Sequence, residues 1–236
     1  MSLTEEKQRI REEVWNRLWK EGISKDPFGR IPDFIGQEKA AELLKEMEIY
    51  KKAKKIFVPP DRAQYEVRVN VVLDDKSLVM ATPKLRDGFY KVDYTCVPER
   101  FLKLAVLSRY ITKYGKKLHT SYEDIGRVDL MVTGAVAVSR YGERIGKSSG
   151  YFDLEYAILW EIGSVGPTTP IVATVHDIQI FSKLPTETHD VPVDYIITPK
   201  DIIKIEPFYK KPKGINWNYV DDEILRKIPP LKELRH

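Results

Sequence analysis

The chain has 236 residues, of which 42% are hydrophobic and 31% charged, and its formal net charge is +4 at pH 7. This composition is typical of a globular protein with its own core, and the interspersed charges argue against a nucleic-acid partner. The single cysteine, Cys96, excludes an intrachain disulfide and a cysteine-based zinc site. No apolar run reaches the roughly 18 residues that cross a bilayer, so we expect a cytoplasmic protein without a membrane partner.

Segments with helical spacing of apolar residues alternate with short runs of β-branched residues. Thr4 is predicted to cap the first helix, because Glu5 and Glu6 follow it in the first turn. In chain order, the predicted helices cover residues 4–20, 37–52, 62–73 and 99–114, a segment that starts after Gly150, and residues 221–227. The predicted strands cover residues 55–58, 78–81, 129–132, 171–175, 194–198 and 202–205.

Strands separated by helices are typical of right-handed βαβ units. Because these strands lack polar alternation, we expect a sheet that is covered on both faces. The predicted fold class is therefore α/β. Residues 1–206 are predicted to form a single domain, and residues 207–236 an irregular C-terminal tail rich in lysine, proline and aromatic residues.

A loop rich in glycine and serine, residues 142–153, precedes the helix that starts after Gly150. Glycine lets backbone N–H groups approach an anion closely, and a helix N-terminus adds a partial positive charge. Arg144 and Lys147 are expected to neutralise phosphate oxygens, and Asp153 to hold a bridging Mg²⁺. The spacing differs from that of a P-loop, so an ordinary surface loop is the alternative.

Two further clusters have residue types suited to a metal–phosphate complex. Lys7 and Arg11 lie four residues apart and share one helix face. They can bind a polyphosphate there, or they can form a solvated basic face. His189 and Asp190 lie in a proline-flanked loop before a strand, a common ligand position in α/β sheets. Asp190 is a candidate magnesium ligand, and His189 is a candidate for either a functional or a structural role.

These segments together resemble the 5-formyltetrahydrofolate cyclo-ligase family, also called methenyltetrahydrofolate synthetase. Residues 7–11 are similar to its K-x-x-L-R element, and residues 144–153 to its loop R-L-G-x-G-x-G-Y-Y-D. Residues 184–198 are similar to its L-P-x-x-x-H-D segment and the strand after it. Residues 30–34 and 82–86 further resemble a divergent branch, the methenyltetrahydrofolate synthase domain-containing proteins.

The resemblance implies a three-layer α/β/α fold with a mostly parallel sheet, similar to the sugar-phosphate isomerase and CoA-transferase group. It implies an ATP- and Mg²⁺-dependent cyclo-ligase that converts 5-formyltetrahydrofolate, or a related reduced pterin, to the 5,10-methenyl form with release of ADP and phosphate. Arg144 and Asp153 would be catalytic, and Asp153 and Asp190 would hold the metal. The implied ATP-binding residues are Lys7, Arg11, Arg144, Ile145, Gly146, Lys147, Ser148, Ser149, Gly150, Tyr151, Phe152, Asp153 and Asp190.

The implied folate-binding residues are Tyr151 and Phe152, together with Gln64 or Glu66 as candidates for the family's folate-contacting glutamate. Ser148 replaces the middle glycine of the family loop, and Ser149 replaces its next basic residue. The alternative function is therefore a catalytically inactive or RNA-associated nucleotide-binding module with the cyclo-ligase fold. The aromatic and basic residues 208–211 motivate the RNA-associated form.

Overall fold

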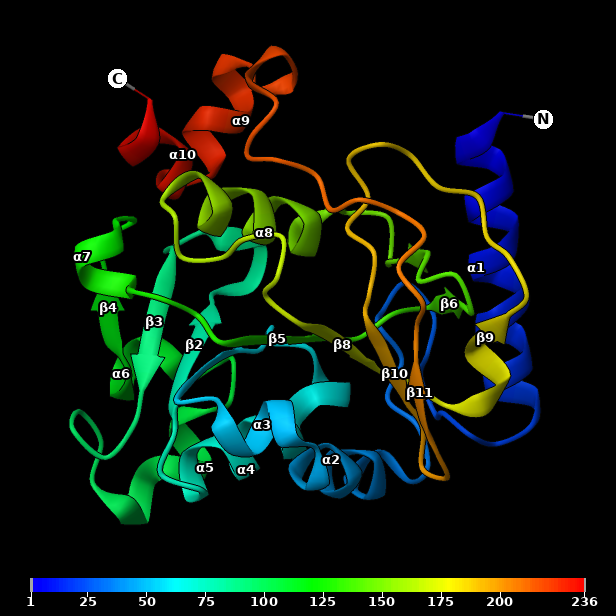
Figure 1. Ribbon diagram of the computed structural model, residues 1–236, viewed down its shortest axis with the longest axis horizontal. Coiled ribbons are helices and arrows are strands. Elements are labelled where there is room, and N and C mark those ends of the chain that lie inside the picture. Colours follow the sequence, from blue (N-terminus) through cyan, green and yellow to red (C-terminus); the bar gives the residue numbers. More distant parts are fainter. Residues whose placement is uncertain (1, 236) are drawn as a thin grey trace.

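The computed structural model describes residues 2–235 and has a large mixed sheet at its centre (Figure 1). The strands of this sheet are β1 (Lys55–Phe57), β2 (Ser77–Ala81), β3 (Phe89–Val92), β4 (Lys116–Leu118), β5 (Leu130–Thr133), β8 (Ile171–Thr174), β10 (Tyr195–Ile197) and β11 (Ile202–Lys204). Their order is β11-β10-β8-β5-β1-β2-β3-β4. The central strands β10, β8, β5, β1 and β2 run parallel, and the outer strands pair antiparallel. The predicted α/β class with a mostly parallel sheet is confirmed.

Helices cover both faces of the sheet. They are α1 (Leu3–Lys20), α2 (Gln37–Glu46), α3 (Glu48–Lys52), α4 (Tyr65–Leu73), α5 (Leu102–Ala105), α6 (Ile111–Tyr114), α7 (Tyr122–Ile125), α8 (Tyr151–Glu161), α9 (Asp222–Lys227) and α10 (Pro229–Leu234). Figure 1 shows α8, α9 and α10 on one face and α2, α3 and α4 on the other. Within residues 2–235, no helix has both the length and the hydropathy that a membrane crossing requires.

Successive residues of the central strands point into two separate cores. Ile56 and Val58 pack in the core that contains residues of α1, α2 and α4, whereas Phe57 packs in the core of α8. Leu130 and Met131 of β5 divide between the two cores in the same way. Each such apolar side chain stabilises the fold by about 1.5–3 kcal/mol when fully buried. Burial on both faces explains why the strand sequences show no polar alternation, and it gives the predicted three layers.

The first two predicted helices differ from the structure at their ends. Ser2, not Thr4, caps α1: its hydroxyl accepts from the Glu5 N–H at 3.2 Å, and the Glu5 carboxylate accepts from the Ser2 N–H at 2.7 Å. This reciprocal capping box starts the helix earlier than predicted. The helix predicted over 37–52 is split at Met47, whose extended ψ of 137° separates α2 from α3.

The helix predicted over 99–114 is interrupted because a distant arginine uses one of its carbonyl groups. In a continuous α-helix the Val106 carbonyl would accept from the Tyr110 N–H, but Tyr110 donates to Leu107 instead. The Val106 carbonyl accepts from the buried Arg68 Nε at 2.8 Å. Arg68 also donates to the Pro59 carbonyl at 2.6 Å and to that of Asp61. Arg68 therefore joins two segments that the sequence separates widely.

A second, small sheet includes a hairpin in the segment between β5 and α8, where the sequence predicts only a loop. It contains β6 (Ala137–Ser139), β7 (Arg144–Ile145) and β9 (Ile180–Phe181), with β6 and β7 antiparallel. Gly142 makes the turn of this hairpin at φ 90°, and a Cβ there would lie 2.7 Å from the Val193 carbonyl oxygen. Glycine is therefore required at the turn. Arg144 consequently projects from a strand rather than from a loop.

The C-terminal segment packs on the second core through two short helices. The helix predicted over 221–227 corresponds to α9, and α10 follows it directly. Leu225, Ile228 and Leu231 are buried in the core that contains Phe57 and α8. Two prolines open α10, a position where proline fits a helix because no N–H is needed.

Candidate functional site

A cleft of about 530 Å³ opens at the carboxyl ends of the parallel strands. Its wall includes Asp61 after β1, Gly134 after β5 and Lys84 after β2. β2 pairs with β1 on one side, and β5 pairs with β1 on the other side. The connection from β1 to β2 and the connection from β5 to β8 therefore run in opposite directions along the sheet. Open α/β sheets bind ligands in the crevice that forms at such a point.

The structure brings the residues predicted for ATP and magnesium to this one cleft. Lys7 and Arg11 reach it from α1, and Asp190 reaches it from the loop before β10. The glycine- and serine-rich segment 144–153 provides the wall between them and continues into α8. Residues that are distant in sequence therefore surround a single space. The cleft also includes Asp61, Lys84 and Glu155, which the sequence did not indicate as site residues.

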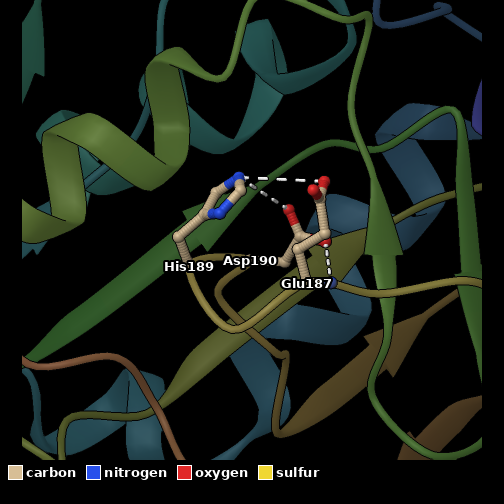
Figure 2. Close-up of side chains that lie close together, drawn as sticks. All are labelled: Glu187, His189 and Asp190. Atoms are coloured by element: carbon tan, nitrogen blue, oxygen red, sulfur yellow. Dashed lines mark hydrogen bonds and ion pairs between the residues drawn. The ribbon is translucent and has the colours of Figure 1, made fainter. Parts of the chain in front are cut away.

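The loop that carries Asp190 has three polar side chains turned toward one another (Figure 2). His189 Nε2 lies 3.9 Å from the Glu187 carboxylate and 3.8 Å from that of Asp190. One donor atom from each residue lies within 4.8 Å of the others. The Lys7 ammonium pairs with the same carboxylates, at 2.8 Å from Glu187 and 2.6 Å from Asp190. Lys7 thus compensates the charge of this acidic cluster.

Arg144 is held tightly at the start of the glycine- and serine-rich segment. Its guanidinium donates to Asp153 at 2.5 Å and lies over the Phe152 ring, 4.8 Å from the centroid. The same Asp153 oxygen accepts from the Val191 N–H at 2.8 Å. The Nε atom of Arg144 is buried and has no hydrogen-bond partner in the part of the chain that the structure describes. A buried donor without a partner is uncommon in a native structure, and Arg144 lines the cleft.

Two further contacts fix the glycine- and serine-rich segment from outside. Arg11 Nε donates to the Gly146 carbonyl at 2.7 Å, and burial lowers the Arg11 pKa, an effect that the charge of Asp190 partly offsets. Lys147 pairs with Asp61 at 2.8 Å. Asp61 could have been found from its place in the loop after the parallel strand β1, where α/β folds present ligand-binding groups.

The backbone of this segment is strained at one position. Ser148 has φ 94°, a left-handed value that favours glycine and is uncommon for residues with a Cβ. Gly150 also has a positive φ, 63°, and forms the N-cap of α8. Such strain persists only where surrounding contacts impose it, and it is concentrated at ligand-binding sites.

Glu155 is a buried carboxyl group in the wall of the cleft. Its side chain is 3% exposed, and its Oε2 atom has no hydrogen-bond partner among residues 2–235. Burial raises the pKa of Glu155 well above its usual value, and Asp61 and Asp153 add to this rise. The positive charges of Lys147 and Arg144 oppose it. Sequence reasoning missed this residue because its spacing in α8 matches an ordinary helical surface position.

The two candidates for a folate-contacting residue do not line the cleft. Gln64 is fully buried and donates to the Thr174 hydroxyl at 3.0 Å. It lies directly behind Gly134, where a Cβ would approach the Gln64 amide within 2.7 Å. Glu66 is partly exposed on α4. Gln64 therefore supports the cleft wall, and Glu66 lies outside it.

The chain matches the model of the 5-formyltetrahydrofolate cyclo-ligase family over residues 3–199. It is 37% identical to the methenyltetrahydrofolate synthase domain-containing protein of Bos taurus over 238 residues, which cover 98% of this chain and 62% of that protein. The chain thus spans less than two thirds of the length of this relative. A 5-formyltetrahydrofolate cyclo-ligase of Mycolicibacterium smegmatis is 32% identical over 78 residues, 33% of this chain and 37% of that protein. The 5,10-methenyltetrahydrofolate synthetase of Aquifex aeolicus has a similar fold, with a TM-score of 0.55 and 21% identity over 89% of this chain and 96% of that chain.

Proposed function

The chain belongs to the 5-formyltetrahydrofolate cyclo-ligase family, as its motifs predicted, and from this premise we propose that it is an ATP- and Mg²⁺-dependent cyclo-ligase. It converts 5-formyltetrahydrofolate, or a related reduced pterin, to the 5,10-methenyl form and releases ADP and phosphate. The buried Arg144 is the observation that carries this proposal. Arg144 lines the same cleft as Lys7 and Lys147, and its Nε N–H has no hydrogen-bond partner among the described residues.

The charges of the cleft suit a metal-bound polyphosphate better than a free anion. Lys7, Arg144 and Lys147 each pair with a carboxylate of the cleft. If an anion without a metal ion bound these three side chains, their partner carboxylates would lose their compensating charge in a partly buried site, which is unfavourable. A metal–phosphate complex supplies both charges, because phosphate oxygens replace the carboxylates and the metal neutralises them.

Asp153 and Asp190 are the residues that we propose to hold Mg²⁺. Carboxylate oxygens fit this ion, which proteins usually bind through one or two carboxylates together with substrate phosphates. Both residues line the cleft beside a cation that can hold a phosphate, Arg144 and Lys7 respectively. The ion supplies neutralisation of the negative charge on the phosphates.

The reaction requires the protein to position the two substrates and to stabilise charge, and it requires no protein nucleophile. The formyl oxygen attacks the γ-phosphorus of ATP, and the bond between that phosphorus and the ADP oxygen breaks. N10 of the pterin then attacks the formyl carbon, loses its proton, and phosphate leaves with the former formyl oxygen. Arg144 stabilises the charge on the transferred group, because Asp153 and Phe152 hold its guanidinium in a fixed orientation. Tyr151, next to Phe152 in the cleft wall, borders the pterin or the adenine.

The test is an assay of the purified chain with Mg-ATP and 5-formyltetrahydrofolate, following the methenyl chromophore and ADP together. Asp153→Asn and Arg144→Lys are expected to abolish both products. Asp222→Asn, an exposed carboxylate of α9, is the matched control and should leave the rate unchanged. Absence of methenyl product at high concentrations of the wild-type chain would refute the proposal.

A second candidate is a nucleotide-binding module that no longer turns over. Ser148 favours it, because this residue has a left-handed backbone where the family loop has glycine. Calorimetric binding of Mg-ATP without methenyl product would support this candidate. The RNA-associated form has less support, because Tyr209 donates to Glu143 and Lys211 pairs with Asp194 within the chain. Salt-sensitive RNA retention on filters would be needed to support it.

A further inference from the structure

Glu155 has a buried oxygen that the protein itself does not satisfy. The residue is 3% exposed, lines the cleft, and Oε2 has no hydrogen-bond partner among the described residues. Leaving a carboxyl group buried without a partner is unfavourable. A native structure rarely contains such a group unless a ligand or ion supplies the missing partner.

The other carboxylates of the cleft differ from Glu155 in this respect. Asp153 accepts from the Arg144 guanidinium and from the Val191 N–H. Asp190 accepts from the Lys7 ammonium at 2.6 Å and from the Glu187 N–H at 2.7 Å. Both groups are therefore compensated within the chain. Glu155 forms no ion pair with any residue from 2 to 235. Of these three carboxyl groups, Glu155 would therefore be stabilised most by a cation in the cleft.

Asp61, in the loop after β1, lines the same cleft as Glu155. Glu155 follows Asp153 by two residues in α8, so the two side chains leave the helix on different sides. The charge of Asp61 acts on Glu155 more strongly than that of Asp153 does. Lys147, which pairs with Asp61 at 2.8 Å, is the cation that most opposes the rise in the pKa of Glu155.

We propose that Glu155 and Asp61 are a carboxylate pair that binds a divalent, oxygen-preferring cation such as Mg²⁺ or Mn²⁺. Two carboxyl groups that line one cleft match the ligand set that such ions take together with phosphate oxygens. When the cation binds Asp61, the Lys147 ammonium leaves Asp61 and binds a phosphate oxygen instead. The inference rests on the proposed function for the source of the phosphate, and it names a carboxylate pair distinct from Asp153 and Asp190.

Mn²⁺ is the probe, because free Mn²⁺ can be quantified by electron paramagnetic resonance. The full chain, Glu155→Gln and Asp61→Asn are titrated with Mn²⁺ alone and with Mn²⁺ and ATP. Each substitution removes one ligand charge with little change in shape, and each is expected to weaken Mn²⁺ binding by about tenfold or more. Glu123→Gln, an exposed residue of α7, is the control and should bind Mn²⁺ within about twofold of wild type.

Stability measurements separate loss of the ligand from loss of the fold. Glu155→Gln is expected to melt, without metal, at a temperature no lower than wild type, because the amide is uncharged and has nearly the shape of the buried carboxyl group. Added Mn²⁺ should raise the melting temperature of wild type and of Glu123→Gln, and not that of Glu155→Gln. Mn²⁺ binding to Glu155→Gln as tight as to wild type would overturn the inference, and so would absence of Mn²⁺ binding to wild type.

The outcomes distinguish this inference from the proposed function. If the wild-type chain forms no methenyl product but Glu155→Gln loses Mn²⁺ affinity, the proposed function fails and the cation pair stands. If turnover occurs and Glu155→Gln retains Mn²⁺ affinity, the cation pair alone is wrong. ATP titrations in excess EDTA report on the nucleotide without metal, and Glu155→Gln should match wild type in them.

Discussion

Lys147 and Asp61 form an ion pair of 2.8 Å that ties the glycine- and serine-rich segment to the residues after β1. The pair lies at the cleft edge, with side-chain exposures of 36% for Lys147 and 18% for Asp61. Its contribution to stability is therefore modest, in the range of about 0–1 kcal/mol for a partly exposed pair. The more important consequence is that the positively charged Lys147 side chain is held beside the cleft before a phosphate binds.

Lys147→Met is expected to separate affinity from stability. It should weaken Mg-ATP binding by about tenfold or more, because the chain loses a charge that contacts phosphate. The free energy of unfolding should change by less than about 1 kcal/mol. Calorimetry with Mg-ATP and urea unfolding measure the two effects. Lys232→Met, an exposed residue of α10, is the control, and an equal loss of affinity in both variants would contradict the prediction.

Ser148→Gly is expected to stabilise the chain by about 1 kcal/mol, because glycine adopts the φ of 94° without steric cost. The same change removes a Cβ beside the phosphate path, so Mg-ATP affinity should rise as well. Ser149→Gly is the matched control: Ser149 has no positive φ, and extra chain entropy should lower its stability instead. Thermal unfolding and ATP titration of the two variants check both signs. A lower stability for Ser148→Gly than for wild type would contradict the assignment of strain.

The sequence was sufficient where a structure depends on local periodicity or on local spacing. The parallel strands were found because their β-branched runs are buried on both faces, as Ile56 and Phe57 illustrate. Lys7 and Arg11 were found because residues four apart share a helix face. Their common cleft with Asp190 followed from the family motif, since no local pattern relates residues so distant in the chain.

The remaining features depend on contacts between distant residues. The helix predicted over 99–114 is broken by Arg68, whose guanidinium takes the Val106 carbonyl from another part of the chain. The hairpin that carries Arg144 has strands of two and three residues, too short to show alternation. Asp61 and Glu155 are ordinary polar residues in the sequence. Asp61 lies in the loop after a strand, and only tertiary burial distinguishes Glu155.

His176 is expected to make the chain less stable in mild acid. Burial is the main cause that lowers its pKa, and Nδ1 accepts from the Ile178 N–H at 3.3 Å at the start of a short 3₁₀ helix. The unfolded chain therefore takes up a proton at higher pH than the folded chain. Stability decreases as pH falls through the unfolded pKa of about 6.5 toward the lower folded pKa.

Urea unfolding at pH 7.5 and pH 5.0 checks this effect of His176. His176→Asn keeps a side-chain acceptor at the cap position and cannot titrate, so its loss of stability between the two pH values should be smaller than that of wild type. The exposed His119 provides the control, and His119→Asn should lose as much stability as wild type. An identical pH dependence in all three proteins would exclude His176 as the cause.

Leu231→Ala tests whether the C-terminal segment belongs to the folded unit. Leu231 of α10 is fully buried in the core that also contains Phe57 and α8. Replacing a buried leucine by alanine removes apolar contacts and leaves a cavity, so stability should fall by about 2–5 kcal/mol. Lys232→Ala, the exposed neighbour, should change stability by less than about 0.5 kcal/mol. If Leu231→Ala unfolded at the same urea concentration as wild type, α10 would not share the cooperative core.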